Sequence, residues 1–282
     1  MAKNDNLTDF LTGIANALRK KNGTSAKINP QNFEIEIKSI KSGSMNDVTK
    51  KTIDRTVEVV TMDDLQGATY IGNYAFYNCS GLTSVTIPDS VTSIGESAFS
   101  NCSSLTSIII PNSVTSIREF AFSNCRGLTS ITIGSSVTSI SPNAFVVCNG
   151  LISITVSSDN TRYHSNENCL IKTESKELIL GCKNSVIPTD GSVTSIGYSA
   201  FYGCSGLTNI IIPDSVTSIG YSAFYGCSGL ISVTMLSKTP PTLGLDVFPS
   251  NVTTITVPVG CGDAYKTAEG WSDYADKIVE AT

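Results

Sequence analysis

The 282-residue sequence is poor in the side chains on which catalytic and metal sites depend. It has one histidine and one tryptophan, and charged residues make up only 15% of it. The lone histidine, His164, excludes most histidine-based catalytic arrangements unless it carries one itself. The serines recur in Thr-Ser pairs and not in a G-x-S-x-G motif, and no phosphate-binding loop is found. We therefore expect no enzymatic activity, no catalytic residues and no cofactor.

Long apolar runs are missing too. No run approaches the roughly eighteen residues that a transmembrane helix requires, so we expect no membrane insertion. The first residues, Met1 to Asp5, lack the apolar segment of a signal peptide. The net charge of −5 is divided unevenly, because residues 1–60 hold ten Lys/Arg and seven Asp/Glu, or +3, which leaves −8 for the remainder. This acidic remainder argues against a nucleic-acid partner.

Nine cysteines are present, but none forms a C-x-x-C motif, and their spacing is not that of a metal site. Six of them recur at one position of a repeat: Cys79, Cys102, Cys125, Cys148, Cys204 and Cys227. Free cysteine behaves as a small hydrophobic residue, so this spacing favours a column of buried thiols. Disulfides between adjacent repeats are the alternative, because stacking brings the Cα atoms to a distance that a disulfide accepts. The odd number leaves at least one thiol outside any intrachain pairing.

The repeat itself is the main feature of the sequence. The motif Val-Thr-Ser-Ile ends at Ile94, Ile117, Ile140, Ile196 and Ile219. Ala-Phe pairs end at Phe76, Phe99, Phe122, Phe145, Phe201 and Phe224, and four of the five gaps between them are 23 residues. A fixed period of this size indicates a solenoid, in which each repeat buries its apolar face only against its neighbours.

One repeat shows how the strands should lie. In Leu82-x-x-Val85-x-Ile87, Val85 and Ile87 point one way, whereas Ser84 and Thr86 point the other way. Pro88 ends the strand because it has no N–H to donate. We expect roughly eight such strands, about 4.8 Å apart, between about residues 57 and 257.

The full pattern, I-G-x-x-A-F-x-x-C-x-x-L-x-x-I-x-I-P, resembles the BspA-like, bacterial surface-antigen type of leucine-rich repeat, over about residues 60–258. The resemblance implies a mostly β (α/β-type), right-handed leucine-rich-repeat solenoid with 23-residue repeats. It also implies a non-enzymatic binding or adhesion role.

The N-terminal residues differ from the repeats. Apolar positions in residues 5–40 follow a helical period and predict a hairpin of two helices, which is too small to be stable alone. Its apolar faces must pack either on the solenoid, as a cap, or on copies of itself, as an oligomer. Residues 14–40 also resemble a short module at the start of phage and prophage tail-associated proteins, which implies a virion-associated or extracellular location.

We divide the chain into four parts. These are a helical attachment or oligomerisation segment (1–45), a linker with a first atypical strand (46–60), the solenoid (61–258) and a C-terminal cap (259–282). In the cap we expect a helix over residues 262–268, a buried Trp271, and no strand after Ile255 to Val257.

One long insert interrupts the array at about residues 157–192, where the gap between Ala-Phe pairs is 56 residues, or 23 plus 33. Two apolar runs around residues 173–176 predict a β-hairpin. The insert is either a lateral protrusion that contacts a ligand or, as we favour, a longer variant of the same repeat.

Two surfaces are candidates for binding. The first is formed by the outward strand positions: Ser84, Thr86, Ser107, Ile109, Ser130, Thr132, Ser153, Thr155, Asn209, Ile211, Ser232 and Thr234. They predict a flat, nearly uncharged sheet suited to a protein or glycan, although the exposed face of any sheet favours such residues. The second is an aromatic stripe, for which recent duplication of one repeat is the alternative explanation: Tyr74, Tyr77, Tyr198, Tyr202, Tyr221 and Tyr225.

We therefore predict a non-enzymatic module that recognises a protein or glycan on another surface. The competing hypothesis is a structural component of a phage tail or other assembly, in which the solenoid is only a spacer.

Overall fold

The computed structural model describes residues 47–48 and 57–282. The predicted helical hairpin, its proposed oligomerisation and its resemblance to phage tail proteins all fall outside these residues. The described residues belong to one compact unit that consists mainly of short strands.

The elements in chain order are β1 (Asp47–Val48), β2 (Val59–Val60), β3 (Tyr70–Ile71), β4 (Ser84–Val85), β5 (Ser93–Ile94), β6 (Ser107–Ile110), β7 (Ser116–Ile117), β8 (Ser130–Ile133), β9 (Ser139–Ile140), β10 (Ser153–Val156), β11 (Tyr163–Asn166), β12 (Cys169–Lys172), β13 (Glu177–Leu180), β14 (Ser195–Ile196), β15 (Asn209–Ile212), β16 (Ser218–Ile219), β17 (Ser232–Met235), β18 (Thr242–Leu243), β19 (Thr254–Val257), α2 (Gly262–Thr267), the 3-10 helix η2 (Ser272–Lys277) and β20 (Ile278–Glu280).

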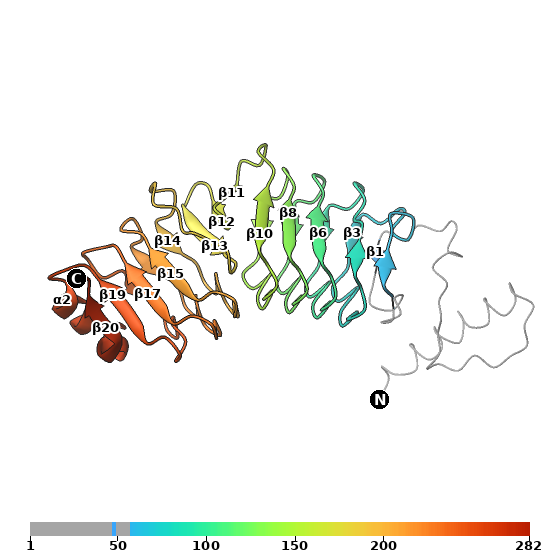
Figure 1. Ribbon diagram of the computed structural model, residues 1–282. Helices are drawn as coiled ribbons and strands as arrows, with labels where there is room; N and C mark the ends of the chain where they lie inside the picture. The colour runs from blue at the N-terminus through green and yellow to red at the C-terminus, as the bar shows by residue number, and fades with distance from the viewer. Residues whose placement is uncertain (1–46, 49–56) are drawn as a thin grey trace, which may run out of the picture. The chain divides into compact units, whose positions relative to one another are not determined.

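Each regular repeat contributes one strand to each of two rows (Figure 1). One row holds two-residue strands in the order β1-β3-β5-β7-β9. The other begins with the two-residue strands β2-β4 and continues with strands of three or four residues, in the orders β6-β8-β10 and, after the insert, β15-β17-β19-β20. Strands that pair in the regular repeats are parallel, and opposite residues lie one repeat apart in the chain, as Ser107 lies opposite Ser130. The predicted mostly β solenoid, with its constant repeat length, is therefore confirmed.

Apolar side chains alternate with polar ones along the strands, as the pattern predicted. In β6, Ile108 and Ile110 are buried, whereas Ser107 and Ile109 are exposed. After the two-residue strand of each regular repeat comes a corner segment, x-x-x-Ala-Phe-x-x-Cys, which begins with Gly except at Arg118 and Ser141 and whose Phe is also buried. Four of these rings form a continuous column, with centroids 4.9–5.1 Å apart: Phe76, Phe99, Phe122 and Phe145. Offset stacking of this kind adds to the gain from burial, so successive repeats hold one another in register.

Polar atoms are also paired from repeat to repeat. The hydroxyl of Thr115 donates to the backbone oxygen of Thr92 at 3.1 Å, and that of Thr138 donates to Thr115 in the same way. The thiol of Cys125 donates to the backbone oxygen of Phe99 at 3.1 Å. All nine cysteines are buried free thiols. The threonine hydroxyls and cysteine thiols thus add a second hydrogen bond to carbonyls that already accept a backbone N–H, such as those of Thr92 and Phe99, and so link each repeat to the next.

The predicted β-hairpin is confirmed. Strands β12 and β13 pair antiparallel across residues 173–176, and β11 pairs antiparallel with β12. The hairpin continues the sheet of the following repeats, in the order β11-β12-β13-β14-β16-β18. The insert is therefore built into the row of strands as a longer variant of a repeat, as we favoured over a lateral protrusion.

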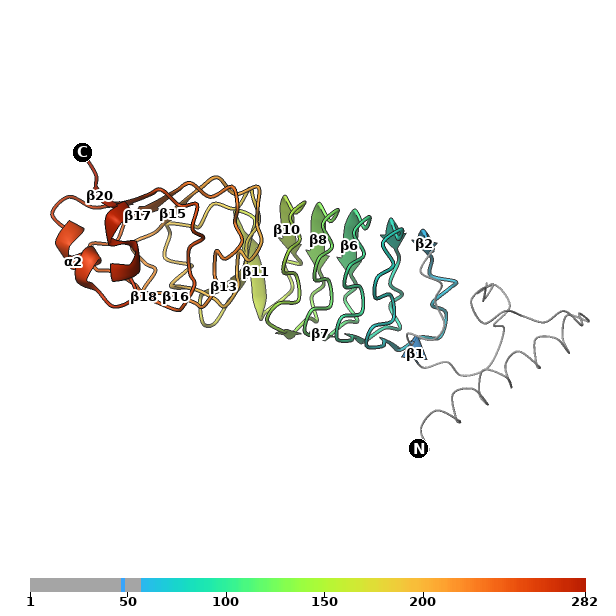
Figure 2. The same cartoon turned by 90° about the horizontal axis from the view of Figure 1, so that it is seen from below.

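The C-terminal region closes the solenoid (Figure 2). The helix expected over residues 262–268 is confirmed as α2, and Trp271 is completely buried, with its indole N–H donating to Pro241 O at 2.7 Å. The prediction that no strand follows β19 is wrong. Strand β20 pairs parallel with β19, and Ile278 lies opposite Ile255. A single buried apolar residue in the sequence Ile-Val-Glu did not signal a strand, because the edge of β19 supplies the hydrogen bonds.

Candidate binding surfaces

The twelve predicted binding residues lie at the outward positions of β4, β6, β8, β10, β15 and β17, or directly after β4. Four are opposite one another in pairs across β6 and β8, namely Ser107 with Ser130 and Ile109 with Thr132. The row that contains these strands is interrupted at the insert, because β10 belongs to one sheet and β15 to another. We call these twelve residues the strand face; eight of them lie on or directly after strands before the insert and four on strands after it.

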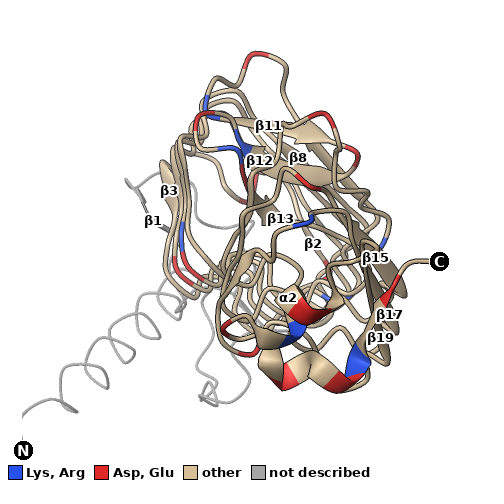
Figure 3. Ribbon diagram, turned by 90° about the vertical axis from the view of Figure 1, so that its left-hand side faces the viewer, with Lys and Arg blue, Asp and Glu red and all other residues tan. Residues whose placement is uncertain are grey.

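The strand face carries no charged residue, and two of its members are large exposed aliphatic side chains. Ile109 is 67% exposed and Ile211 is 50% exposed. Charged residues lie elsewhere, as Figure 3 shows for α2 and several loops, whereas β17 and β19 hold none. A rigid, uncharged surface with hydroxyls and isolated aliphatic groups can form hydrogen bonds and bury apolar area without the cost of desolvating a charge.

The tyrosines do not form one stripe. Tyr198 stacks on Tyr221 with centroids 5.5 Å apart, and Tyr202 stacks on Tyr225 at 5.3 Å. Tyr74 belongs to a corner segment at the other end of the array, and its hydroxyl donates to Glu96 at 2.8 Å. This hydrogen bond to a carboxylate raises the pKa of Tyr74. The aromatic surface is therefore two short columns in the later repeats, well separated along the chain from Tyr74.

The two tyrosine columns border a groove of about 530 Å³. It lies where the insert interrupts the array, over the corner segments 141–148 and 197–204 and their neighbours, and we call it the seam groove. Its lining consists of Phe120, Ser123, Asn143, Val146, Val147, Tyr198, Ser199, Tyr202, Tyr221, Ser222, Tyr225 and Asp246. Of this set, the sequence indicates only the four tyrosines, because the groove depends on where the insert places them.

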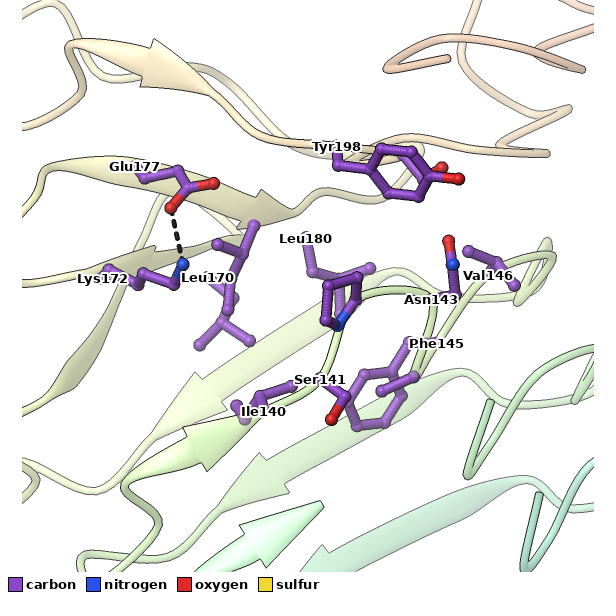
Figure 4. Close-up of a pocket in the computed structure, with 14 residues that line it drawn as sticks. Ile140, Ser141, Asn143, Phe145, Val146, Leu170, Lys172, Glu177, Leu180 and Tyr198 are labelled. Atoms are coloured by element: carbon purple, nitrogen blue, oxygen red, sulfur yellow. Dashed lines mark hydrogen bonds and ion pairs between the residues drawn. The ribbon is translucent and has the colours of Figure 1, made fainter. Parts of the chain in front are cut away.

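A smaller cavity of about 80 Å³, the seam cavity, adjoins the groove (Figure 4). Its walls include Phe145, Leu170 and Leu180, and it shares Asn143 and Tyr198 with the groove. At its far side Lys172 Nζ pairs with Glu177 Oε2 at 2.6 Å. Both side chains are only partly exposed, and each neutralises the charge of the other.

His164 does not organise a catalytic site. Its Nδ1 lies 3.1 Å from the hydroxyl of Thr173 across the hairpin, and it lines neither the seam groove nor the seam cavity. Across residues 57–282, no cluster of three or more His, Cys, Asp or Glu side chains could hold a metal ion.

Comparison with known proteins agrees with this arrangement. The family described as "BspA type Leucine rich repeat region" matches residues 69–190 and 176–267, in six copies. The chain belongs to this family. BspA-type proteins are repeat proteins that generally bind other molecules and generally lack enzymatic activity, and the described residues contain no helix suited to crossing a membrane.

Three solved structures illustrate the relationship of this BspA-type chain. A leucine-rich repeat protein from Eubacterium ventriosum is 25% identical, with a TM-score of 0.49, over 74% of this chain and 68% of its own. A leucine-rich cell surface protein from Faecalibacterium prausnitzii is 26% identical (TM-score 0.45; 79% and 77% covered). A leucine-rich repeat protein from Bacteroides ovatus is 26% identical (TM-score 0.48; 83% and 63% covered). No curated protein matches the chain.

Proposed function

We propose that this chain is a non-enzymatic adhesion module whose strand face recognises a protein or glycan on another surface. The observation that supports this most is the combination of an uncharged sheet surface with the exposed Ile109 and Ile211. Large exposed apolar side chains on a rigid scaffold are a feature of interaction sites. Repeats that hydrogen-bond through both backbone and side chains keep this surface fixed, so little conformational entropy is lost on binding.

We further propose that the module acts on the outside of a cell or of a virion. Residues 5–40 would attach it there or assemble several copies of it, and several copies on one carrier would raise the avidity for a repetitive surface. The alternative, a spacer in a tail or other assembly, makes no use of the strand face. The two hypotheses therefore differ in what a change of that face does.

The test is to place charge on the strand face. In a triple variant, Thr86, Thr132 and Thr234 are each changed to Lys. Attachment of the purified full chain to a panel of bacterial cells, extracellular-matrix proteins and arrayed glycans is measured before and after. We expect attachment to fall at least about tenfold, because three unpaired ammonium groups must be desolvated at the interface.

A matched control carries the same charge elsewhere. Ser104, Thr189 and Ser228 are exposed and lie off the strand face, so changing these three to Lys adds an equal +3. This control should attach like the original chain. If the strand-face variant also attached normally to every surface that the original chain recognises, the strand face would not be the binding site and the spacer hypothesis would gain.

A further inference from the structure

The insert creates a second surface that differs from the strand face. We infer that the seam groove and the seam cavity form one peptide-binding site, which takes an extended, non-acidic segment of a partner protein and anchors it by one aliphatic side chain. This inference rests on the proposed binding function and names the class of ligand for a separate part of the solenoid.

The groove exists because two corner segments diverge at the insert. In the regular repeats the backbone N–H of each corner Phe donates to the Ala of the next, as from Phe76 to Ala98 at 2.7 Å and from Phe122 to Ala144 at 2.8 Å. At the insert, the N–H of Gly181 takes that place and donates to Ala200 at 2.8 Å. The hairpin therefore separates the inner parts of the two segments, whereas their outer parts stay joined by the bond from Val147 N–H to Tyr202 at 3.2 Å. The groove lies over this junction.

The lining of the groove resembles a recognition surface in composition. Tyr198 and Tyr202 stand on one side, and Asn143, Val146 and Val147 belong to the facing corner segment. Tyrosine provides a large, rigid contact area with a hydroxyl at its tip, and Ser and Asn provide adaptable hydrogen bonds, which is the composition of antibody paratopes. Each tyrosine is already supported by its stacked neighbour, so little side-chain entropy remains to be lost on binding.

The seam cavity favours a peptide over a glycan. Its volume of about 80 Å³ is roughly half that of an engineered cavity of about 150 Å³ that accepts benzene. It therefore suits one branched aliphatic side chain, and its walls include Leu170, Leu180 and Phe145. The same lining also holds Ser141, Asn143 and Ser199, which can hydrogen-bond to a peptide backbone, whereas a sugar hydroxyl placed against the three apolar side chains would lose its hydrogen bonds to water. A peptide lying along an aromatic groove can instead direct one apolar side chain into such a cavity.

Charge limits the ligand further. Asp246 is the only charged residue in the lining of the groove, and the charges of Lys172 and Glu177 in the cavity neutralise each other. No cationic side chain in either lining remains to compensate an acidic ligand, which argues against acidic peptides and against nucleic acid. A neutral or basic segment meets no such obstacle.

The backbone adds an independent observation. Val147 has a φ of +61°, a conformation that a β-branched residue rarely adopts. At this position the other corner segments that share the conformation hold Asn or Gly, namely Asn78, Asn101, Asn124, Gly203 and Gly226. Strained residues of this kind occur preferentially at ligand sites. Val147 lines the groove, and its N–H donates to Tyr202 at 3.2 Å, so the strain lies within the proposed site.

The experiment uses a displayed library of random peptides of about twelve residues, selected against the full chain. Selected peptides should be rich in aliphatic residues and poor in Asp and Glu. Their dissociation constants are then measured on Tyr202→Ala, which shortens the wall of the groove, and on Ser141→Leu, which fills the cavity from its rim. We expect each change to weaken binding at least about tenfold. Tyr77→Ala removes a tyrosine at the equivalent corner position far from the insert and should change binding less than about twofold.

Two results would overturn the inference. One is that selected peptides bind the groove and cavity variants as well as the original chain, or that no peptide is enriched at all. The other is that the same variants abolish binding to an arrayed neutral glycan while peptides do not bind, which would make the site a glycan site. The urea midpoint of each variant shows whether it is folded, and two chemically different variants prevent one misfolded protein from deciding the result.

The Lys variant of the strand face separates this inference from the proposed function. It should keep its affinity for the selected peptides, because none of its three changed residues lines the groove or the cavity. If that variant lost attachment to cells whereas the groove variants kept both attachment and peptide binding, the proposed function would stand and the peptide site would be wrong.

Discussion

The repeats before the insert and the junction at the insert use the same sequence motif with different results. Before it, Phe76, Phe99, Phe122 and Phe145 stack in one column and every corner segment contacts the next. Beyond it, a second column begins with Phe201 and Phe224, whose centroids are 4.9 Å apart. The hairpin separates Phe145 from Phe201 along the chain, and the seam cavity and the seam groove lie at this junction.

This difference shows what constant spacing does in a solenoid. Where the repeat length is constant, each side chain meets its equivalent in the next repeat, and stacking leaves almost no free space. Where the insert lengthens one repeat, the hairpin continues one row of strands but cannot continue the Phe column. Space for a ligand therefore arises at this irregular junction, and the regular repeats provide a rigid frame on either side.

The buried cysteines of the repeats, which we call the thiol column, make it possible to test whether the repeats before and after the insert unfold together. We expect this test to give the largest effect. Burial raises the pKa of Cys148 and of Cys227 to about 12 and also raises the pKa of Cys125 and Cys204. In the unfolded chain these thiols have a pKa of about 8.5. The unfolded state therefore loses protons that the folded state keeps, so this contribution to stability is complete below about pH 8.5 and falls as pH rises towards about 12. Each thiol should cost about 1.4 kcal/mol per pH unit in that window.

The measurement is urea unfolding followed by circular dichroism between about pH 8 and 10.5, in the presence of a non-thiol reductant. If the repeats before and after the insert unfold as one unit, each urea curve should show one transition, whose midpoint falls steeply as pH rises. Two separate transitions in one curve would mean that the insert uncouples the two sets of repeats. Cys227→Ala should make the fall of the unfolding free energy with pH less steep by about 1.4 kcal/mol per pH unit, the contribution of one thiol. A stability that did not change above about pH 9 would contradict the assignment of these cysteines to the buried column.

A pair of Phe substitutions compares the two regions directly. Phe99 is completely buried between Phe76 and Phe122, so Phe99→Ala should cost about 4 kcal/mol. Phe145 has a stacked ring on one side and borders the seam cavity on the other, so Phe145→Ala should cost about 1 kcal/mol less. Chemical denaturation of both variants measures the difference. Equal losses would show that the junction is packed as tightly as the regular repeats.

The smallest expected effect concerns the strained backbone at the junction. Val147→Asn replaces a β-branched residue at positive φ by one that tolerates it, and should stabilise the protein by about 1 kcal/mol. Gly226→Val makes the reverse change at the same position of a regular pair of repeats and should destabilise by about 1 to 2 kcal/mol. Thermal or urea unfolding measures both. If Val147→Asn were destabilising, the valine would be making contacts that outweigh its strain.

Much of the fold could be predicted because it is local. The alternation in Leu82 to Ile87 identifies the buried face of a strand, and the hairpin around residues 173–176 follows from two apolar runs. Strand β20 could not be predicted in this way. Its residues contain little pattern of their own, and they become a strand because β19 offers an unpaired edge.

The candidate site was predictable only in part. The sequence indicates that Tyr198, Tyr202, Tyr221 and Tyr225 flank buried phenylalanines, but it suggests equally that Tyr74 belongs with them. Only the structure shows two separate columns beside Asn143 and Val147. The sequence does show Val147 at a position where most of the other repeats have Asn or Gly. That difference indicates backbone strain only once the positive φ of Val147 is known.

The sequence by itself determined the repeat, the buried face of each strand and the thiol column, because a fixed period of apolar residues can be buried only by stacking each repeat on the next. Only the tertiary structure decided where the stack opens. The groove and cavity depend on how two corner segments, distant in the chain, separate around the hairpin. This separation follows from the packing of Gly181 and Leu180 against residues of both corner segments, not from any local pattern.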